Sequence, residues 1–99
     1  MTRVTRENFK IWQYPGGERG VTLLNIDSNP LEINLIWRIC NSNDLIDLLL
    51  AVDAIKYTYP QAHLKELIIP YLPYARQDKR DGLGVSFSLK VVTQILDNI

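Results

Sequence analysis

The chain has 99 residues, which is the size of one small domain or part of one. Hydrophobic residues make up 46% of the chain, enough for a buried core, and 11 basic residues balance 11 acidic ones. A net charge of zero gives no electrostatic reason to expect binding of nucleic acid or of an anionic membrane by the whole surface. We therefore expect neither partner, although a local basic cluster can still bind a phosphate.

The cysteine content and the N-terminal segment favour a reducing, cytoplasmic setting. Cys40 is the one cysteine, so no internal disulfide is possible, and residues 1–7 lack the apolar core of a secretion signal. Apolar runs such as 48–52 are too short to cross a bilayer. Cys40 follows an apolar strand pattern with no His or second Cys nearby, so we expect a small core residue.

Alternating apolar residues and turn formers predict short strands in the first part of the chain. Strands are expected at 9–13 and 21–26, and they can pair as an antiparallel hairpin across the Pro-Gly-Gly turn at 14–18. The clearest period-two pattern covers 31–39. Its inward-facing residues are expected to be Leu31, Ile33, Leu35, Trp37 and Ile39.

Polar caps and apolar stripes predict two helices in the rest of the chain, with a strand between them. Asn41 and its polar neighbours can cap a helix at 44–57, which ends at Tyr59-Pro60. Its buried stripe is expected to be Leu45, Leu48, Leu49, Val52 and Ile55, with Asp44, Asp47 and Lys56 outside it. A buried strand at 67–69 follows. The last helix, capped by Ser86 or Ser88, carries Leu89, Val92, Ile95 and Leu96 on one side.

The order strand, helix, strand, helix predicts an α/β fold with a mainly parallel sheet flanked by helices. No repeat or linker divides the chain, so we expect one domain over residues 1–99. The chain stops at Ile99 within an amphipathic pattern, and the parallel strand expected after that helix is missing. We therefore expect an incomplete domain.

Six charged or amide-bearing residues follow the predicted strand at 67–69, and open α/β sheets bind ligands at such strand ends. They are Arg76, Gln77, Asp78, Lys79, Arg80 and Asp81. The Arg76 guanidinium can bind a phosphate through two N–H groups or stack on a base, and the Gln77 amide suits the edge of adenine. The competing interpretation is a solvated charged loop.

The stretch 43–96 resembles the N-terminal domain of ribose-phosphate pyrophosphokinase, also called PRPP (phosphoribosyl pyrophosphate) synthetase. Segments 43–50, 67–78, 79–81 and 86–92 match in order, and the Pro-Tyr-Ala-Arg-Gln-Asp run at 73–78 is the most specific of them. The resemblance implies a phosphoribosyltransferase-like N-terminal domain. It also implies that Arg76 and Gln77 bind ATP, that Asp81 supports the site, and that Lys79 and Arg80 approach phosphates.

A second, weaker match lies upstream, in residues 14–18. This segment resembles the family's aromatic-x-x-Gly-Glu segment, which contacts the adenine of a neighbouring subunit's nucleotide. The resemblance implies that Tyr14 stacks on the base and that Glu18 or the Gly16 backbone binds its edge. Family members often carry Asn or Asp at the Gly16 position, so no side-chain contact is expected there. An ordinary Pro-Gly turn is the alternative.

The family reaction transfers diphosphate from ATP to ribose 5-phosphate with Mg²⁺. The family's metal-binding histidine, its catalytic loop and its ribose-phosphate loop correspond to positions beyond Ile99. The resemblance therefore implies an adenine-binding portion that is inactive alone, with no catalytic or metal-binding residue of its own. His63 is expected at the surface, and Asp44 and Asp47 are expected to complement the helix dipole rather than form a metal pair.

Two other functions stay open from the sequence. The chain can be a non-catalytic module that docks with a full synthetase and modulates it, because family enzymes form homo-oligomers through N-terminal domains. It can also bind nucleic acid through Arg76, Lys79, Arg80, Tyr71 and Tyr74. The zero net charge and the interleaved aspartates argue against nucleic acid.

Overall fold

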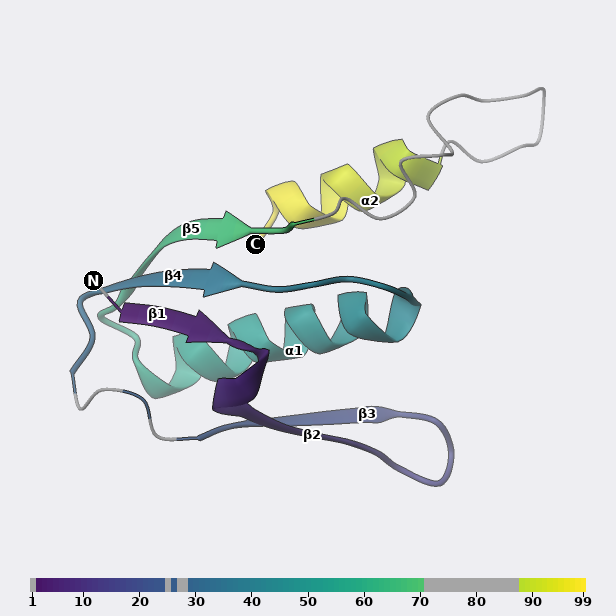
Figure 1. Cartoon of the computed structure of the whole chain (residues 1–99), viewed down its shortest axis with the longest axis horizontal. Helices are drawn as coiled ribbons and strands as arrows, with labels where there is room; N and C mark the ends of the chain where they lie inside the picture. The colour runs from purple at the N-terminus through teal and green to yellow at the C-terminus, as the bar shows by residue number, and fades with distance from the viewer. Residues whose placement is uncertain (1, 25, 27–28, 71–87) are drawn as a thin grey trace.

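The structure is a computed structural model, and it describes residues 2–24, 26, 29–70 and 88–99. Figure 1 shows its elements in chain order, with one short 3-10 helix, η1, between the first two strands. They are β1 (Thr2–Thr5), η1 (Arg6–Asn8), β2 (Phe9–Gln13), β3 (Arg19–Leu23), β4 (Glu32–Ile36), α1 (Ser42–Thr58), β5 (His63–Ile68) and α2 (Ser88–Asp97).

Three of the strands form a parallel sheet in the order β1-β4-β5. Helix α1 is the crossover between β4 and β5, so the predicted α/β class with a mainly parallel sheet is confirmed. Strand β1 was not predicted. Strand β5 begins at His63, which is exposed as expected, and therefore includes residues that the sequence placed in a polar link.

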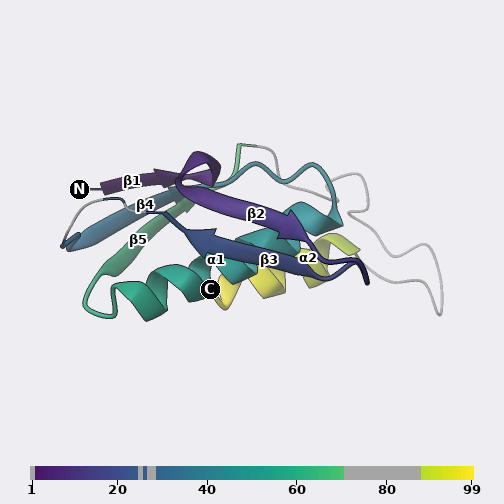
Figure 2. The same cartoon turned by 90° about the horizontal axis from the view of Figure 1, so that it is seen from below.

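Strands β2 and β3 form a separate antiparallel hairpin, as predicted, with Phe9 opposite Leu23 and Gln13 opposite Arg19. Strand β3 ends three residues earlier than predicted, at Leu23. Figure 2 shows the hairpin running beside α1, and strand β3 makes many contacts with that helix. The hairpin is thus held by the helix rather than by the parallel sheet.

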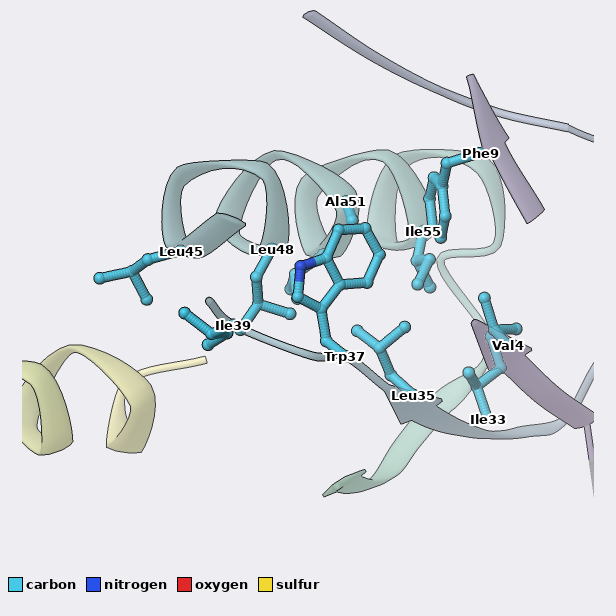
Figure 3. Packing of buried hydrophobic residues seen from close by; sticks show 11 residues of the cluster. Val4, Phe9, Ile33, Leu35, Trp37, Ile39, Leu45, Leu48, Ala51 and Ile55 are labelled. Atoms are coloured by element: carbon cyan, nitrogen blue, oxygen red, sulfur yellow. The ribbon is translucent and has the colours of Figure 1, made fainter. Parts of the chain in front are cut away.

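The core lies between the parallel sheet and α1 (Figure 3), and Trp37 is its largest buried side chain. The Trp37 ring meets Phe9 edge to face, with ring centroids 5.5 Å apart, and its Nε1–H donates to the Asp44 carbonyl oxygen at 3.0 Å. Burial of the inward positions of 31–39 is confirmed from Ile33 to Ile39. It is wrong for Leu31, which is 76% exposed, because this residue precedes β4 and only its backbone carbonyl joins the ladder, accepting from His63.

Helix α1 begins at Ser42, two residues before the predicted start, and Asn41 is its N-cap: the Asn41 side chain accepts a hydrogen bond from the Asp44 amide at 3.0 Å. The predicted stripe is buried except for Leu49, which is half-buried, and Ala51 is buried as well. Asp47 corrects the prediction: it was expected outside the stripe, but it is fully buried because two arginines compensate its charge.

Cys40 also corrects the prediction, because its side chain is exposed rather than in the core. Beyond β4 buried and exposed residues continue to alternate through Trp37, Arg38 and Ile39, so Cys40 falls on the exposed side. The Cys40 amide donates to an Asp44 carboxylate oxygen at 2.8 Å, which ties the backbone to the helix start. The side chain is left outside the packed layers.

The strand predicted to be buried at 67–69 is only half-buried, with Ile68 41% exposed, because β5 is the outer strand of the described sheet. In α2, the expected apolar side is confirmed for Val92, which is buried, and for Ile95 and Leu96, which are half-buried. The Leu89 side chain lies outside what the structure describes. Neither helix of the described ranges has the length and apolar character that crossing a membrane requires.

Candidate nucleotide-binding site

The hairpin turn at residues 14–18 is closed by two backbone hydrogen bonds. The Tyr14 amide donates to the Glu18 carbonyl at 2.8 Å, and the Gly17 amide donates to the Tyr14 carbonyl at 2.9 Å. Gly17 has φ of 96°, in the left-handed region that glycine adopts without a steric cost. The turn predicted from Pro15 and the two glycines is therefore confirmed.

The side chains of the hairpin turn leave an aromatic ring and a carboxylate at the surface. Tyr14 is 47% exposed, and its ring meets the Trp12 ring edge to face at 5.8 Å between centroids. The Glu18 carboxylate lies beside the Gly16 backbone, where a Cβ on Gly16 would overlap it. A turn with this geometry can offer a stacking surface and an acceptor to a base.

One buried carboxylate anchors the hairpin to α1. Arg19 donates to the two Asp47 carboxylate oxygens, from Nε at 2.9 Å and from Nη2 at 2.7 Å. Arg6, in η1, donates to Asp47 at 3.3 Å and to Asp44 at 2.9 Å. The two arginines balance the two aspartates, which makes burial of Asp47 tolerable.

The hydrogen bond to Asp47 raises the pKa of Arg19 above its ordinary value, against the opposing effect of desolvation. The Arg19 guanidinium therefore stays charged throughout the pH range in which proteins ordinarily remain folded. The sequence did not predict this ion pair. A signal was present, because Asp47 lies four and eight residues before the buried Ala51 and Ile55, on the same face of the helix.

Two features of the fold lie at one end of the molecule, and a third points toward that end. In Figure 1 the hairpin turn and the first residues of α1 lie at this end, and β5 runs toward it. Pro70 follows β5 and directly precedes the charged loop in the sequence. The loop residues Arg76, Gln77, Lys79, Arg80 and Asp81 lie outside the described residues, so their placement stays a prediction.

An open hollow of about 480 Å³ lies where β4 and β5 end. It is lined by Arg3, Asn34, Ile36, Ile68 and Pro70. Asn34 and Ile36 alternate with the buried residues of β4 that face α1, so the hollow is on the opposite face of the sheet. The carboxyl ends of parallel strands are where open α/β sheets bind ligands.

The described residues do not fit a Mg²⁺ ion. Both carboxylates at the start of α1, Asp44 and Asp47, are bound to guanidinium groups. Over the described ranges, no group of three or more His, Cys, Asp or Glu side chains is placed to hold a metal. No metal chemistry is therefore assigned to this part of the chain.

Comparisons with known proteins identify the family. Residues 3–99 match the family model described as the N-terminal domain of ribose phosphate pyrophosphokinase. The chain is 39% identical over 56 residues to ribose-phosphate pyrophosphokinase of Porphyromonas gingivalis, covering 57% of this chain and 17% of that protein. It is 29% identical over 90 residues to ribose-phosphate pyrophosphokinase A of Dictyostelium discoideum, covering 88% of this chain and 27% of that protein. The matched region thus spans about a quarter or less of these relatives. The chain belongs to the family of ribose phosphate pyrophosphokinase N-terminal domains.

Proposed function

We propose that this chain supplies the adenine-nucleotide-binding portion of a ribose-phosphate diphosphokinase. Such an enzyme transfers diphosphate from ATP to ribose 5-phosphate and releases PRPP and AMP. Family membership supports the class of reaction. The observation that supports the binding role is that the hairpin turn, with its exposed Tyr14, lies at the end of the molecule toward which β5 runs.

The hairpin turn contacts the base in this proposal. Tyr14 stacks on adenine, because its ring is half exposed at the surface while Trp12 supports its edge. Glu18 or the Gly16 backbone binds the base edge. Gly16 contributes no side chain, so a contact from that position is limited to its backbone.

The charged loop contacts the rest of the nucleotide. Arg76 and Gln77 bind ATP, Lys79 and Arg80 approach the phosphates, and Asp81 supports the site. Guanidinium and ammonium groups suit this task because they neutralise the charge of a polyphosphate.

In this proposal residues 1–99 form one domain. The domain is located in the cytoplasm and has no catalytic activity by itself. The Mg²⁺ ligands and the ribose 5-phosphate site belong, in this proposal, to the remainder of the enzyme. Mg²⁺ neutralises phosphate charge when bound there. In a homo-oligomer the hairpin turn of one copy contacts the nucleotide of a neighbouring copy.

A turnover assay tests whether the chain needs the remainder of the enzyme for activity. AMP release from ATP and ribose 5-phosphate is measured with Mg²⁺ for the 99-residue chain alone and for the chain fused to the remainder of a family enzyme. We expect no turnover by the chain and turnover by the fusion. Turnover by the chain alone, or a silent fusion that is folded, contradicts the proposal.

A second candidate function is a non-catalytic module that docks with a complete synthetase and modulates it. The described sheet favours association, because β1 and β5 each pair on one side only among the described strands. Light scattering of the chain with a complete family enzyme, together with the enzyme's rate, tests it. A mixture in which both proteins keep their own mass and the rate is unchanged contradicts it.

A further inference from the structure

Both ends of the hairpin reach one buried carboxylate, but they reach it differently. Arg6 precedes β2 at the base of the hairpin, whereas Arg19 is the first residue of β3, directly after the turn. Each donates to Asp47, which is 0% exposed. The same carboxylate of α1 therefore sets the position of the hairpin at its base and near its turn.

The contact near the turn is the more directional of the two. Arg19 binds the Asp47 carboxylate with two N–H groups, at 2.9 Å and 2.7 Å, in the fork geometry that fixes a guanidinium plane. Its third donor, Nη1, reaches the Gln13 side-chain oxygen at 3.2 Å on the paired strand. Arg6 gives Asp47 one longer contact, at 3.3 Å.

The anchored Arg19 is directly bonded to the turn. Glu18 precedes Arg19 in the chain, and the Glu18 carbonyl accepts the hydrogen bond from the Tyr14 amide that closes the turn. If the Arg19 side chain loses its fixed orientation, the positions of Tyr14 and Glu18 are therefore expected to change as well.

We propose that Arg19, oriented by Asp47, is a positioning residue that holds the hairpin turn in the geometry needed to contact a purine nucleotide. This inference rests on the proposed function, because it assigns a ligand to the turn. It adds that the start of α1 determines where the ligand-contacting groups lie. Arg19 touches no ligand in this proposal.

The experiment compares two matched substitutions in the whole chain, Arg19→Lys and Arg6→Lys. Each keeps the positive charge beside Asp47 and replaces a planar fork by a point charge. Hydrogen exchange is measured at the Tyr14 and Gly17 amides, which both donate within the turn. ATP affinity is measured by calorimetry, and the thermal midpoint reports global stability.

We expect Arg19→Lys to speed exchange at Tyr14 by about tenfold relative to the β4 amides, and to weaken ATP binding by about tenfold. Arg6→Lys is expected to shift the thermal midpoint about as much as Arg19→Lys does, but without faster exchange at Tyr14 relative to the β4 amides. Equal effects of the two substitutions, or unchanged exchange at Tyr14 in Arg19→Lys, overturn the inference. Faster exchange with unchanged ATP affinity also overturns it.

The two proposals fail in different ways. If the wild-type chain binds no ATP, the proposed function fails and the ligand-positioning role fails with it, whatever the exchange rates. If the wild-type chain binds ATP and Arg19→Lys binds it equally well, the nucleotide-binding role stands and the positioning role of Arg19 is wrong.

Discussion

Trp12 packs directly against the backbone of Gly20, its partner on the neighbouring strand of the hairpin. A Cβ at Gly20 would overlap the indole ring, so the glycine is required by close approach rather than by an unusual φ. The indole in turn meets the Tyr14 ring edge to face. Through Trp12, Gly20 therefore affects the orientation of the Tyr14 ring at the surface.

Gly20→Ala should therefore displace the indole and lower the free energy of unfolding by about 1–3 kcal/mol, the usual cost of overpacking. The Trp12–Tyr14 contact should be disturbed, which near-UV circular dichroism detects. Thr22→Ala is the matched control, because Thr22 is exposed two residues further along the same face of β3. An unchanged aromatic spectrum in Gly20→Ala contradicts the role given to this glycine.

Leu48→Ala should destabilise the chain by about 2–5 kcal/mol, because it removes a fully buried side chain between α1 and the sheet. Ile46→Ala, on the exposed side of the same helix, should cost far less. Urea unfolding followed by far-UV circular dichroism measures both. Similar midpoints for the two variants would mean that α1 buries a different face.

The Arg19–Asp47 ion pair should contribute a constant stability from neutral to mildly alkaline pH. A raised pKa means that the contribution is complete below the unfolded-state value and is lost only as pH rises through the higher folded-state value. Both values lie well above the ordinary pKa of lysine. The difference in free energy of unfolding between the wild type and Arg19→Lys should therefore be constant near neutral pH and should widen as pH rises above the ordinary lysine pKa of about 10.4.

Free energies of unfolding at several pH values check this divergence. Arg38→Lys serves as the control, because Arg38 is exposed and lies away from the Asp47 cluster in the contacts described. Its difference from the wild type should stay near zero. A difference between the wild type and Arg19→Lys that is the same at every pH would contradict the assignment.

Arg76→Ala should weaken ATP binding by the complete enzyme while leaving the thermal midpoint within a few degrees of the wild type, because loop residues contribute little to stability. Lys56→Ala removes one positive charge from the last turn of α1, at the opposite end of the molecule, and should leave ATP affinity unchanged. Equal ATP affinity in the wild type and Arg76→Ala would remove the loop from the proposed site.

Local patterns were sufficient for much of the fold. The alternation from Ile33 to Ile39 predicts one buried face, because a strand exposes its two sides to different surroundings. The Asn41 cap and the turn closed by Gly17 depend on short-range hydrogen bonds and backbone conformation, which neighbouring residues determine.

Long-range pairing was not predictable in the same way. The four residues of β1 carry too short a pattern to show that they pair with β4. Burial of Asp47 depends on Arg6 and Arg19, which are 41 and 28 positions away in the chain. For the candidate site, the turn was predicted, but its anchoring to α1 was not.

The most direct test of the nucleotide-binding role is calorimetric titration of ATP into the wild-type chain and into Tyr14→Ala. The proposal predicts measurable binding by the wild type and a loss of about 1–3 kcal/mol, or about 5- to 150-fold in affinity, without the stacking ring. The proposal is contradicted if the folded wild-type chain gives no heat of binding with ATP at any concentration and also shows no binding in equilibrium dialysis.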